Sequence, residues 1–262
     1  PDGAIAASQR SAAAQMGVAR CWYGVNGATG LLQAALLAMA RPGERVLLPR
    51  NVHRSLIQAC VLGDLQPVLF DLPFQSDRGQ PAPVDARWIE RVLEALPSEG
   101  APIRAAVLVH PTYQGYANDP TDVIKHLQQR GCCVLVDEAH GCHFAAGVNH
   151  PLPPSAVHCG ADLVVHSLQK SAAALAQTAV LWLQGERLDP VRVERSLRLL
   201  QTTSPSALLL ASCEEALQHW QRSKGRRQLL HRLQEAENLA GALRDSGVPL
   251  LNNQDPLRLI LH

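Results

Sequence analysis

Four short segments carry side chains or backbone groups that could take part in chemistry. Three follow apolar runs and the fourth precedes a helical pattern: Asp137-Glu138-Ala139-His140, Ser167-Leu168-Gln169-Lys170, His110-Pro111-Thr112-Tyr113 and Asn26-Gly27-Ala28-Thr29-Gly30. Together they offer a carboxylate, an amine, an aromatic hydroxyl and the free N–H groups of a helix start. These groups suit covalent chemistry at the amine and binding of an anion at the helix start.

Lys170 and Asp137 are the most informative pair. Taken singly, Lys170 could be an ordinary surface lysine or an amine desolvated for imine chemistry. Asp137 favours the second interpretation, because it ends an apolar run where a buried carboxylate needs a cationic partner. A protonated pyridine nitrogen is such a partner, and it makes the ring an electron sink. We therefore predict pyridoxal 5'-phosphate (PLP) as cofactor, with Lys170 as its Schiff-base lysine.

Other interpretations of the helix start and of the histidines have to be weighed. The helix start could bind a phosphate, but it lacks the P-loop and dinucleotide fingerprints, so a plain capped helix is the alternative. His140 and His143 flank Cys142, a pattern that could belong to a metal site. Since the sequence offers no second ligand cluster of matching type, we expect no metal.

Short apolar strands alternate with amphipathic helices along the chain. The apolar runs predict strands at residues 45–48, 67–71, 105–110, 133–137, 163–166 and 179–183. Helical patterns fall at residues 5–17, 30–40, 54–62, 85–95, 119–129, 188–200, 206–222 and 226–247. This alternation predicts a three-layer α/β/α fold around a mostly parallel sheet. Active sites of such sheets gather at the C-terminal ends of the strands, where the chemical segments fall.

The last third of the chain is helical, and its final helix is long and rich in charge pairs of the kind that often connects two domains. We predict a PLP-binding large domain over residues 1–213, and interdomain helices with the start of a second domain over residues 214–262. The chain begins at Pro1, close to a helical pattern, and stops just after an apparent strand at residues 257–261. We therefore expect that an N-terminal segment and most of a C-terminal domain are missing.

Composition excludes several classes of partner. The net charge of +1 does not favour nucleic acid or an anionic membrane as a partner. The longest apolar runs, such as residues 31–40, are far shorter than the ~20 residues of a membrane span, and no leader is visible. The seven cysteines are odd in number and form no CxxC pair, so we expect reduced thiols in a cytoplasmic protein.

Five motifs, in the right order and at the right intervals, resemble the major domain of the Orn/Lys/Arg decarboxylases. They are Val25-Asn26-Gly27-Ala28-Thr29-Gly30, Pro49-Arg50-Asn51-Val52-His53-Arg54-Ser55, Val136-Asp137-Glu138-Ala139-His140-Gly141, Ser167-Leu168-Gln169-Lys170 and Gln201-Thr202-Thr203-Ser204-Pro205-Ser206. The resemblance covers nearly the whole chain. It implies the aspartate-aminotransferase-like (type I) PLP fold with a seven-stranded sheet. It also implies decarboxylation of arginine, lysine or ornithine to the amine and carbon dioxide, in a homodimer or higher homo-oligomer.

The resemblance also implies roles for individual residues. Lys170 is similar to the Schiff-base lysine and Asp137 to the partner of the pyridine nitrogen. His53 is similar to a histidine that stacks on the cofactor ring, with Ala139 on the other side and His140 lining the substrate side. The expected catalytic residues are therefore Lys170, Asp137 and His53. The expected contacts to the cofactor phosphate come from Gly27, Ala28, Thr29, Ser167 and Gln169.

Two positions depart from the family pattern. Gln169 stands where the family usually has histidine, so it can donate a hydrogen bond to phosphate but carries no positive charge. Ala28 stands where a hydroxyl residue is common, which removes one phosphate contact. Both changes are expected to weaken cofactor anchoring without affecting Lys170 and Asp137.

Two alternatives stay open beside the decarboxylase. Another type I PLP enzyme, an aminotransferase or a carbon–sulfur lyase, would grip the substrate carboxylate with an arginine, and Arg258 is the nearby candidate. A truncated homologue without activity is the other alternative. The basic amino acid is not specified either, and Glu138 is one carboxylate that could receive its distal charge.

Overall fold

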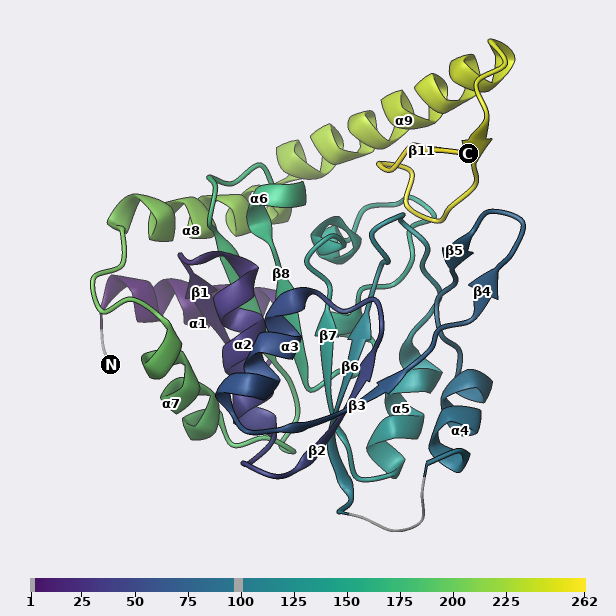
Figure 1. Cartoon of the computed structure of the whole chain (residues 1–262). Coiled ribbons are helices and arrows are strands. Elements are labelled where there is room, and N and C mark those ends of the chain that lie inside the picture. The colour runs from purple at the N-terminus through teal and green to yellow at the C-terminus, as the bar shows by residue number, and fades with distance from the viewer. Residues whose placement is uncertain (1–2, 97–100) are drawn as a thin grey trace.

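The computed structural model describes residues 3–96 and 101–262, and its centre is a seven-stranded sheet (Figure 1). The strands are β1 (Arg20–Gly24), β2 (Arg45–Pro49), β3 (Gln66–Phe70), β6 (Ile103–Val109), β7 (Cys133–Asp137), β8 (Leu163–His166) and β9 (Ala179–Leu183), in the order β1-β9-β8-β7-β6-β2-β3. Strand β9 runs antiparallel to both of its neighbours, whereas β8, β7, β6, β2 and β3 are parallel. The predicted mostly parallel sheet of seven strands is confirmed.

Helices cover both faces of the sheet. They are α1 (Ala4–Met16), α2 (Gly27–Met39), α3 (Arg54–Leu62), α4 (Ala86–Glu94), α5 (Thr121–Gln129), α6 (Leu168–Ser171), α7 (Pro190–Leu200), α8 (Ala207–Gln221) and α9 (Ser223–Asp245), with 3-10 turns η1 (Cys142–Ala146) and η2 (Ala156–His158). Side chains alternate along β7, so that Val134 and Val136 pack with α1, α5 and α8 while Leu135 packs with α2, α3 and α7. This gives the predicted three layers.

Some helices and strands begin or end at other residues than predicted, because turns or pairing with a neighbouring strand determine their bounds. Strands β7, β8 and β9 have the predicted bounds. Strand β1 is not among the predicted strands, because it has only three strand-forming residues between an arginine and a glycine. Its pairing with β9 stabilises it in the fold. The predicted strand at residues 257–261 shortens to β11 (Ile260–Leu261), because Asp255 accepts the N–H of Leu257 and Arg258 in a turn. Helix α9 ends at Asp245, shortly before Gly247 with φ 82°.

Two short hairpins, β4 (Phe74–Gln75) with β5 (Gln80–Pro81) and β10 (Leu250–Leu251) with β11, complete the described structure. Figure 1 shows α9 crossing above the sheet and the chain then returning toward the strand ends. The predicted boundary between residues 213 and 214 falls within α8. Residues 1–2 and 97–100 of the predicted large domain lie outside the described residues, and the division into domains stays a prediction.

All seven cysteines are free thiols, and six of them are buried. Burial raises the pKa of Cys60 and of Cys132 to about 11. These two thiols are therefore protonated near neutral pH and are poor nucleophiles. Within residues 3–96 and 101–262, no helix combines the length and the apolar character that a membrane crossing requires.

Candidate functional site

The structure brings the three predicted catalytic residues to one edge of the sheet. Asp137 is the last residue of β7, Lys170 lies in α6 directly after β8, and His53 caps α3 after β2. Because β2, β7 and β8 are parallel, their C-terminal ends meet at this edge. The site is therefore built by strand order rather than by neighbours in the sequence.

His140 forms the centre of a chain of polar contacts that runs from Lys170 to Arg258. Nζ of Lys170 lies 2.9 Å from Nε2 of His140, and Nδ1 of the same ring receives a hydrogen bond from the guanidinium of Arg258. Since a guanidinium only donates, Nδ1 of His140 carries no proton, and the neutral ring carries its proton on Nε2. In that tautomer the Nε2–H of His140 faces the amine of Lys170.

The electrostatics of the site favour the uncharged forms of these two groups. Burial lowers the pKa of His140 to about 3, and the positive charges of Lys170 and Arg258 act in the same direction. Burial also lowers the pKa of Lys170, an effect to which Arg258 adds and which the carboxylate of Asp137 opposes. A lysine with a depressed pKa has more free amine available for reaction with a carbonyl group.

Asp137 is a buried carboxylate, and its charged form needs a cationic partner to offset the cost of burial. Its side chain accepts a hydrogen bond from the N–H of Ala139 at 3.1 Å. Burial raises the pKa of Asp137, and the Ala139 N–H together with the charges of Lys170 and His53 lowers it again. A protonated pyridine nitrogen would supply the missing charge.

The phosphate cradle predicted from the sequence has suitable donors. The hydroxyl of Ser167 is buried and has no hydrogen-bond partner among the described residues. Helix α2 begins at Gly27, and the N–H groups of a first helical turn have no partner within the helix, so they can bind an anion. The N–H of Gly27 is the exception, because it donates to the carbonyl of Gln177 at 2.7 Å. The N–H of Gln177 in turn donates to Oε1 of Gln169, which leaves the amide nitrogen of Gln169 to face a ligand. These residues fit a phosphate group.

The remaining predicted contacts are placed as follows. The ring of His53 is exposed, and its Nδ1 lies 2.8 Å from the hydroxyl of Ser55 and accepts the N–H of Ser55. Ala139 is buried next to Asp137. Ala28 and Thr29 lie in the first turn of α2. A stacking role for His53 is compatible with this exposed position and stays a prediction.

The carboxylate of Glu138 accepts hydrogen bonds from other buried residues of the chain, so the idea that it receives the distal charge of a substrate is wrong. Its side chain is fully buried. Oε2 accepts hydrogen bonds from Nε2 of His166 and from the hydroxyl of Ser155, each at 2.6 Å, and Oε1 accepts the N–H of Ala156 at 2.9 Å. Trp182 donates to Nδ1 of His166 at 2.9 Å, which fixes the ring proton on Nε2. This network has no signal in the sequence, because its members lie on separate strands and loops.

The two histidines of the possible metal pattern separate in the structure. His140 faces Lys170, whereas Nε2 of His143 lies 3.0 Å from the buried carboxylate of Asp255. Among the residues that the structure describes, no three histidine, cysteine, aspartate or glutamate side chains group as metal ligands. His143 and Asp255 instead join the C-terminal segment to the loop after β7, which brings Arg258 to the site.

Solved structures of PLP enzymes share this fold. Lysine decarboxylase A from Pseudomonas aeruginosa superposes with a TM-score of 0.83 at 21% identity, covering 93% of this chain and 35% of that one. An aspartate aminotransferase from Thermotoga maritima superposes with a TM-score of 0.64 at 15% identity, covering 95% and 64%. The chain therefore has the type I fold of PLP-dependent enzymes.

The sequence also matches the family "Orn/Lys/Arg decarboxylase, major domain" over residues 1–258, and the chain belongs to that family. The YaaO protein of Bacillus subtilis is 35% identical over 91% of this chain and 49% of its own length. An arginine decarboxylase of Halalkalibacterium halodurans is 32% identical over 84% of this chain and 43% of its own length. The chain thus spans about half the length of the curated relatives that it matches. The cofactor of the family is PLP, and the residues at the strand ends fit it.

Proposed function

We propose that this chain carries the cofactor site of a PLP-dependent decarboxylase that converts a basic amino acid to the corresponding amine and carbon dioxide. The observation that supports it most is the convergence of Lys170, His140 and Asp137 at one sheet edge in a member of this family. Arginine is the first substrate to test, because relatives that cover most of this chain are named arginine decarboxylase; lysine and ornithine are the alternatives.

In this proposal Lys170 holds PLP covalently and Asp137 binds the protonated pyridine nitrogen. When bound, PLP supplies an electron sink for the electron pair left behind as the substrate carboxylate departs. His53 would lie against one side of the ring and Ala139 against the other. The phosphate would be held by Ser167 and Gln169 together with the α2 start at Gly27, Ala28 and Thr29.

Proton handling in the proposal falls to His140 and Lys170. His140 donates its Nε2 proton toward Lys170 and so favours the free amine that reacts with a carbonyl. After carbon dioxide leaves, the substrate Cα needs a proton, and Lys170 and His140 are the donors that this edge offers. Arg258 fixes which nitrogen of His140 is protonated, so it acts through the histidine.

The position of Arg258 also supports a second candidate function, that of an aminotransferase or a carbon–sulfur lyase. Its guanidinium contacts His140 and could instead bind a substrate carboxylate, as either of these enzymes requires.

We also propose that residues 1–213 act as the PLP-binding domain and residues 214–262 lead into a second one. The exposed segment Thr202-Thr203-Ser204 would approach the partner's site in a homodimer or higher oligomer, in the cytoplasm.

An assay of products separates these functions. The full chain is loaded with PLP and incubated with arginine, lysine or ornithine, with 2-oxoglutarate present as an amino-group acceptor, and carbon dioxide, amine and keto acid derived from the substrate are measured. Equal amounts of carbon dioxide and amine from one substrate, absent with Lys170→Ala, support the decarboxylase. Keto acid without carbon dioxide favours the aminotransferase. Tight PLP binding with neither product favours a homologue without activity.

A further inference from the structure

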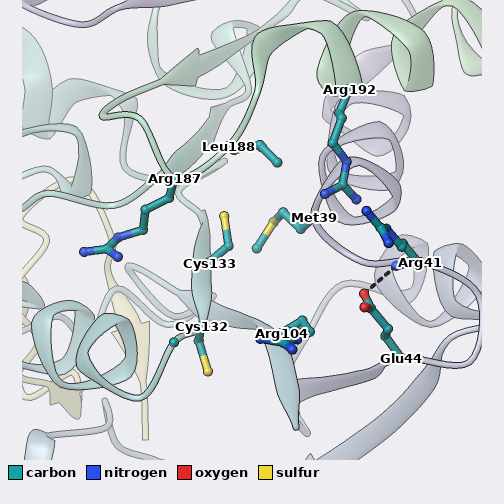
Figure 2. Close-up of a pocket in the computed structure, with 10 residues that line it drawn as sticks. Met39, Arg41, Glu44, Arg104, Cys132, Cys133, Arg187, Leu188 and Arg192 are labelled. Carbon is teal, nitrogen blue, oxygen red and sulfur yellow. Dashed lines mark hydrogen bonds between the residues drawn. The ribbon is translucent and has the colours of Figure 1, made fainter. Parts of the chain in front are cut away.

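Figure 2 shows a hollow of about 440 Å³ that is lined in part by residues near the starts of β6 and β7. Lys170 lies beyond the C-terminal ends of the parallel strands, at the opposite edge of the sheet. Cys133, the first residue of β7, forms part of the wall of the hollow, whereas Asp137 ends the same strand at the site edge. Arg104 lies near the start of the parallel strand β6. Arg187 follows β9, whose reversed direction brings its end to the edge where β6 and β7 start. The hollow is therefore separate from the predicted PLP site.

The charge around this hollow is strongly unbalanced. Its ionisable lining consists of Arg41, Arg104, Arg187, Arg192, Glu44 and the cysteines. The guanidinium of Arg187 lies 3.5 Å from Asp162, and Figure 2 shows it turned away from the other arginines. Glu44 accepts the backbone N–H of Arg41 at 2.8 Å. In the described part of the chain, no carboxylate lies within 4 Å of the guanidinium of Arg41, Arg104 or Arg192.

These three guanidinium groups belong to separate parts of the fold, but all three residues line the same hollow. Arg41 follows α2, Arg104 belongs to β6 and Arg192 to α7, and in Figure 2 the side chains of Arg41 and Arg192 extend toward one another. Arg41 and Arg104 are exposed and Arg192 is half-buried, and an anion bound in the hollow would be attracted by all three charges. The remaining lining includes Met39 and Leu188, both buried, whose side chains offer no competing charge.

We propose that this hollow binds a small multivalent phosphate anion, with a diphosphate group as the smallest unit that it recognises. The planar guanidinium fork matches pairs of phosphate oxygens, and such charge-assisted contacts are among the strongest hydrogen bonds in proteins. A diphosphate carries more oxygens and more negative charge than a single phosphate, so it offers more acceptors to the three guanidinium groups. The volume of the hollow lies in the range of small-molecule sites. The proposal does not depend on the reaction at Lys170.

Calorimetric titration of the full chain with inorganic pyrophosphate tests this site. The protein is saturated with PLP beforehand, so that the cofactor's own phosphate cradle is filled. We expect saturable binding that Arg104→Gln or Arg192→Gln weakens about tenfold or more, since each removes a charge-assisted contact. Arg87→Gln, on the exposed surface of α4, is the matched control and should bind like the unaltered chain.

Two further titrations define the ligand class. Inorganic phosphate is expected to bind more weakly than pyrophosphate, and citrate, a carboxylate of similar charge, more weakly as well. Retained PLP content and an unchanged unfolding temperature in the Arg104→Gln and Arg192→Gln proteins will show that these variants are folded. The proposal is overturned if pyrophosphate gives no saturable binding, if the two pocket variants match the control, or if citrate binds as tightly as pyrophosphate.

Discussion

His166 donates a hydrogen bond from Nε2 to Oε2 of Glu138 across 2.6 Å, and both side chains are fully buried. Glu138 directly follows Asp137 on β7, and His166 directly precedes Ser167 after β8. The pair therefore ties together the two strand ends that carry the predicted contacts to the ring nitrogen and to the phosphate. Neither side chain faces the substrate, so its contribution is to position the residues beside it.

Replacing Glu138 by alanine should destabilise the fold strongly. The change leaves the donors of His166, Ser155 and Ala156 buried without an acceptor. Each such group costs about 1–3 kcal/mol, so we expect a loss of about 3 kcal/mol or more in the free energy of unfolding. Urea unfolding monitored by circular dichroism measures it, with the exposed Glu186→Ala as control. An unchanged midpoint would show that the network contributes nothing.

Gly115→Ala should release the C-terminal segment from the site. Gly115 has φ 82°, and a Cβ there would lie 2.8 Å from Nδ2 of Asn253 and 3.0 Å from Cβ of Arg258. We expect faster cleavage of residues 249–262 in limited proteolysis, because the contacts of this segment with the loop at Gly115 would be broken. Gly185→Ala, also at positive φ but with open space around it, controls for backbone strain alone. Equal cleavage rates in the two variants would contradict this picture.

His140 should make stability depend on pH. Its pKa is lowered to about 3 in the folded chain, below the ordinary value of 6.5, so the unfolded chain binds a proton first as the pH falls. The contribution of His140 to stability is then complete above pH 6.5 and is lost toward pH 3. We expect the urea midpoint to fall less between pH 7 and pH 5 in His140→Gln than in the unaltered chain. Asp137, whose raised pKa acts in the opposite sense, is common to both proteins. Parallel pH profiles would contradict the lowered pKa.

Asp137→Asn should separate cofactor chemistry from folding. An amide is similar in shape to the carboxylate but carries no charge to hold a pyridine proton. We expect decarboxylation to fall by about a hundredfold or more, the scale on which loss of one placed electrostatic partner acts. The stability of the apo chain should not fall, because burial already raises the pKa of this carboxylate. Steady-state kinetics and thermal unfolding measure the two effects. Full activity in Asp137→Asn would contradict the role of Asp137 as partner of the pyridine nitrogen.

The sheet was predictable from sequence because its central strands are apolar runs of the length that buried strands require. Strands β7, β8 and β9 followed directly from that pattern. The edge strand β1 could not be predicted in this way, because pairing with β9 rather than its own sequence stabilises it. In the site, residues that follow a strand were found by their position, whereas the partners of Glu138 and His140 depend on tertiary contacts that no local pattern encodes.

The most direct test of the account is the position at which the chain binds PLP covalently. The sequence contains three lysines, Lys125, Lys170 and Lys224, so the outcome is unambiguous. The PLP-loaded chain is reduced with borohydride and digested, and the pyridoxyl-labelled peptide is identified by mass spectrometry. The account predicts one label, on Lys170, that persists in Lys125→Arg and Lys224→Arg and disappears in Lys170→Ala. A label on Lys125 or Lys224, or no label at saturating PLP, would contradict it.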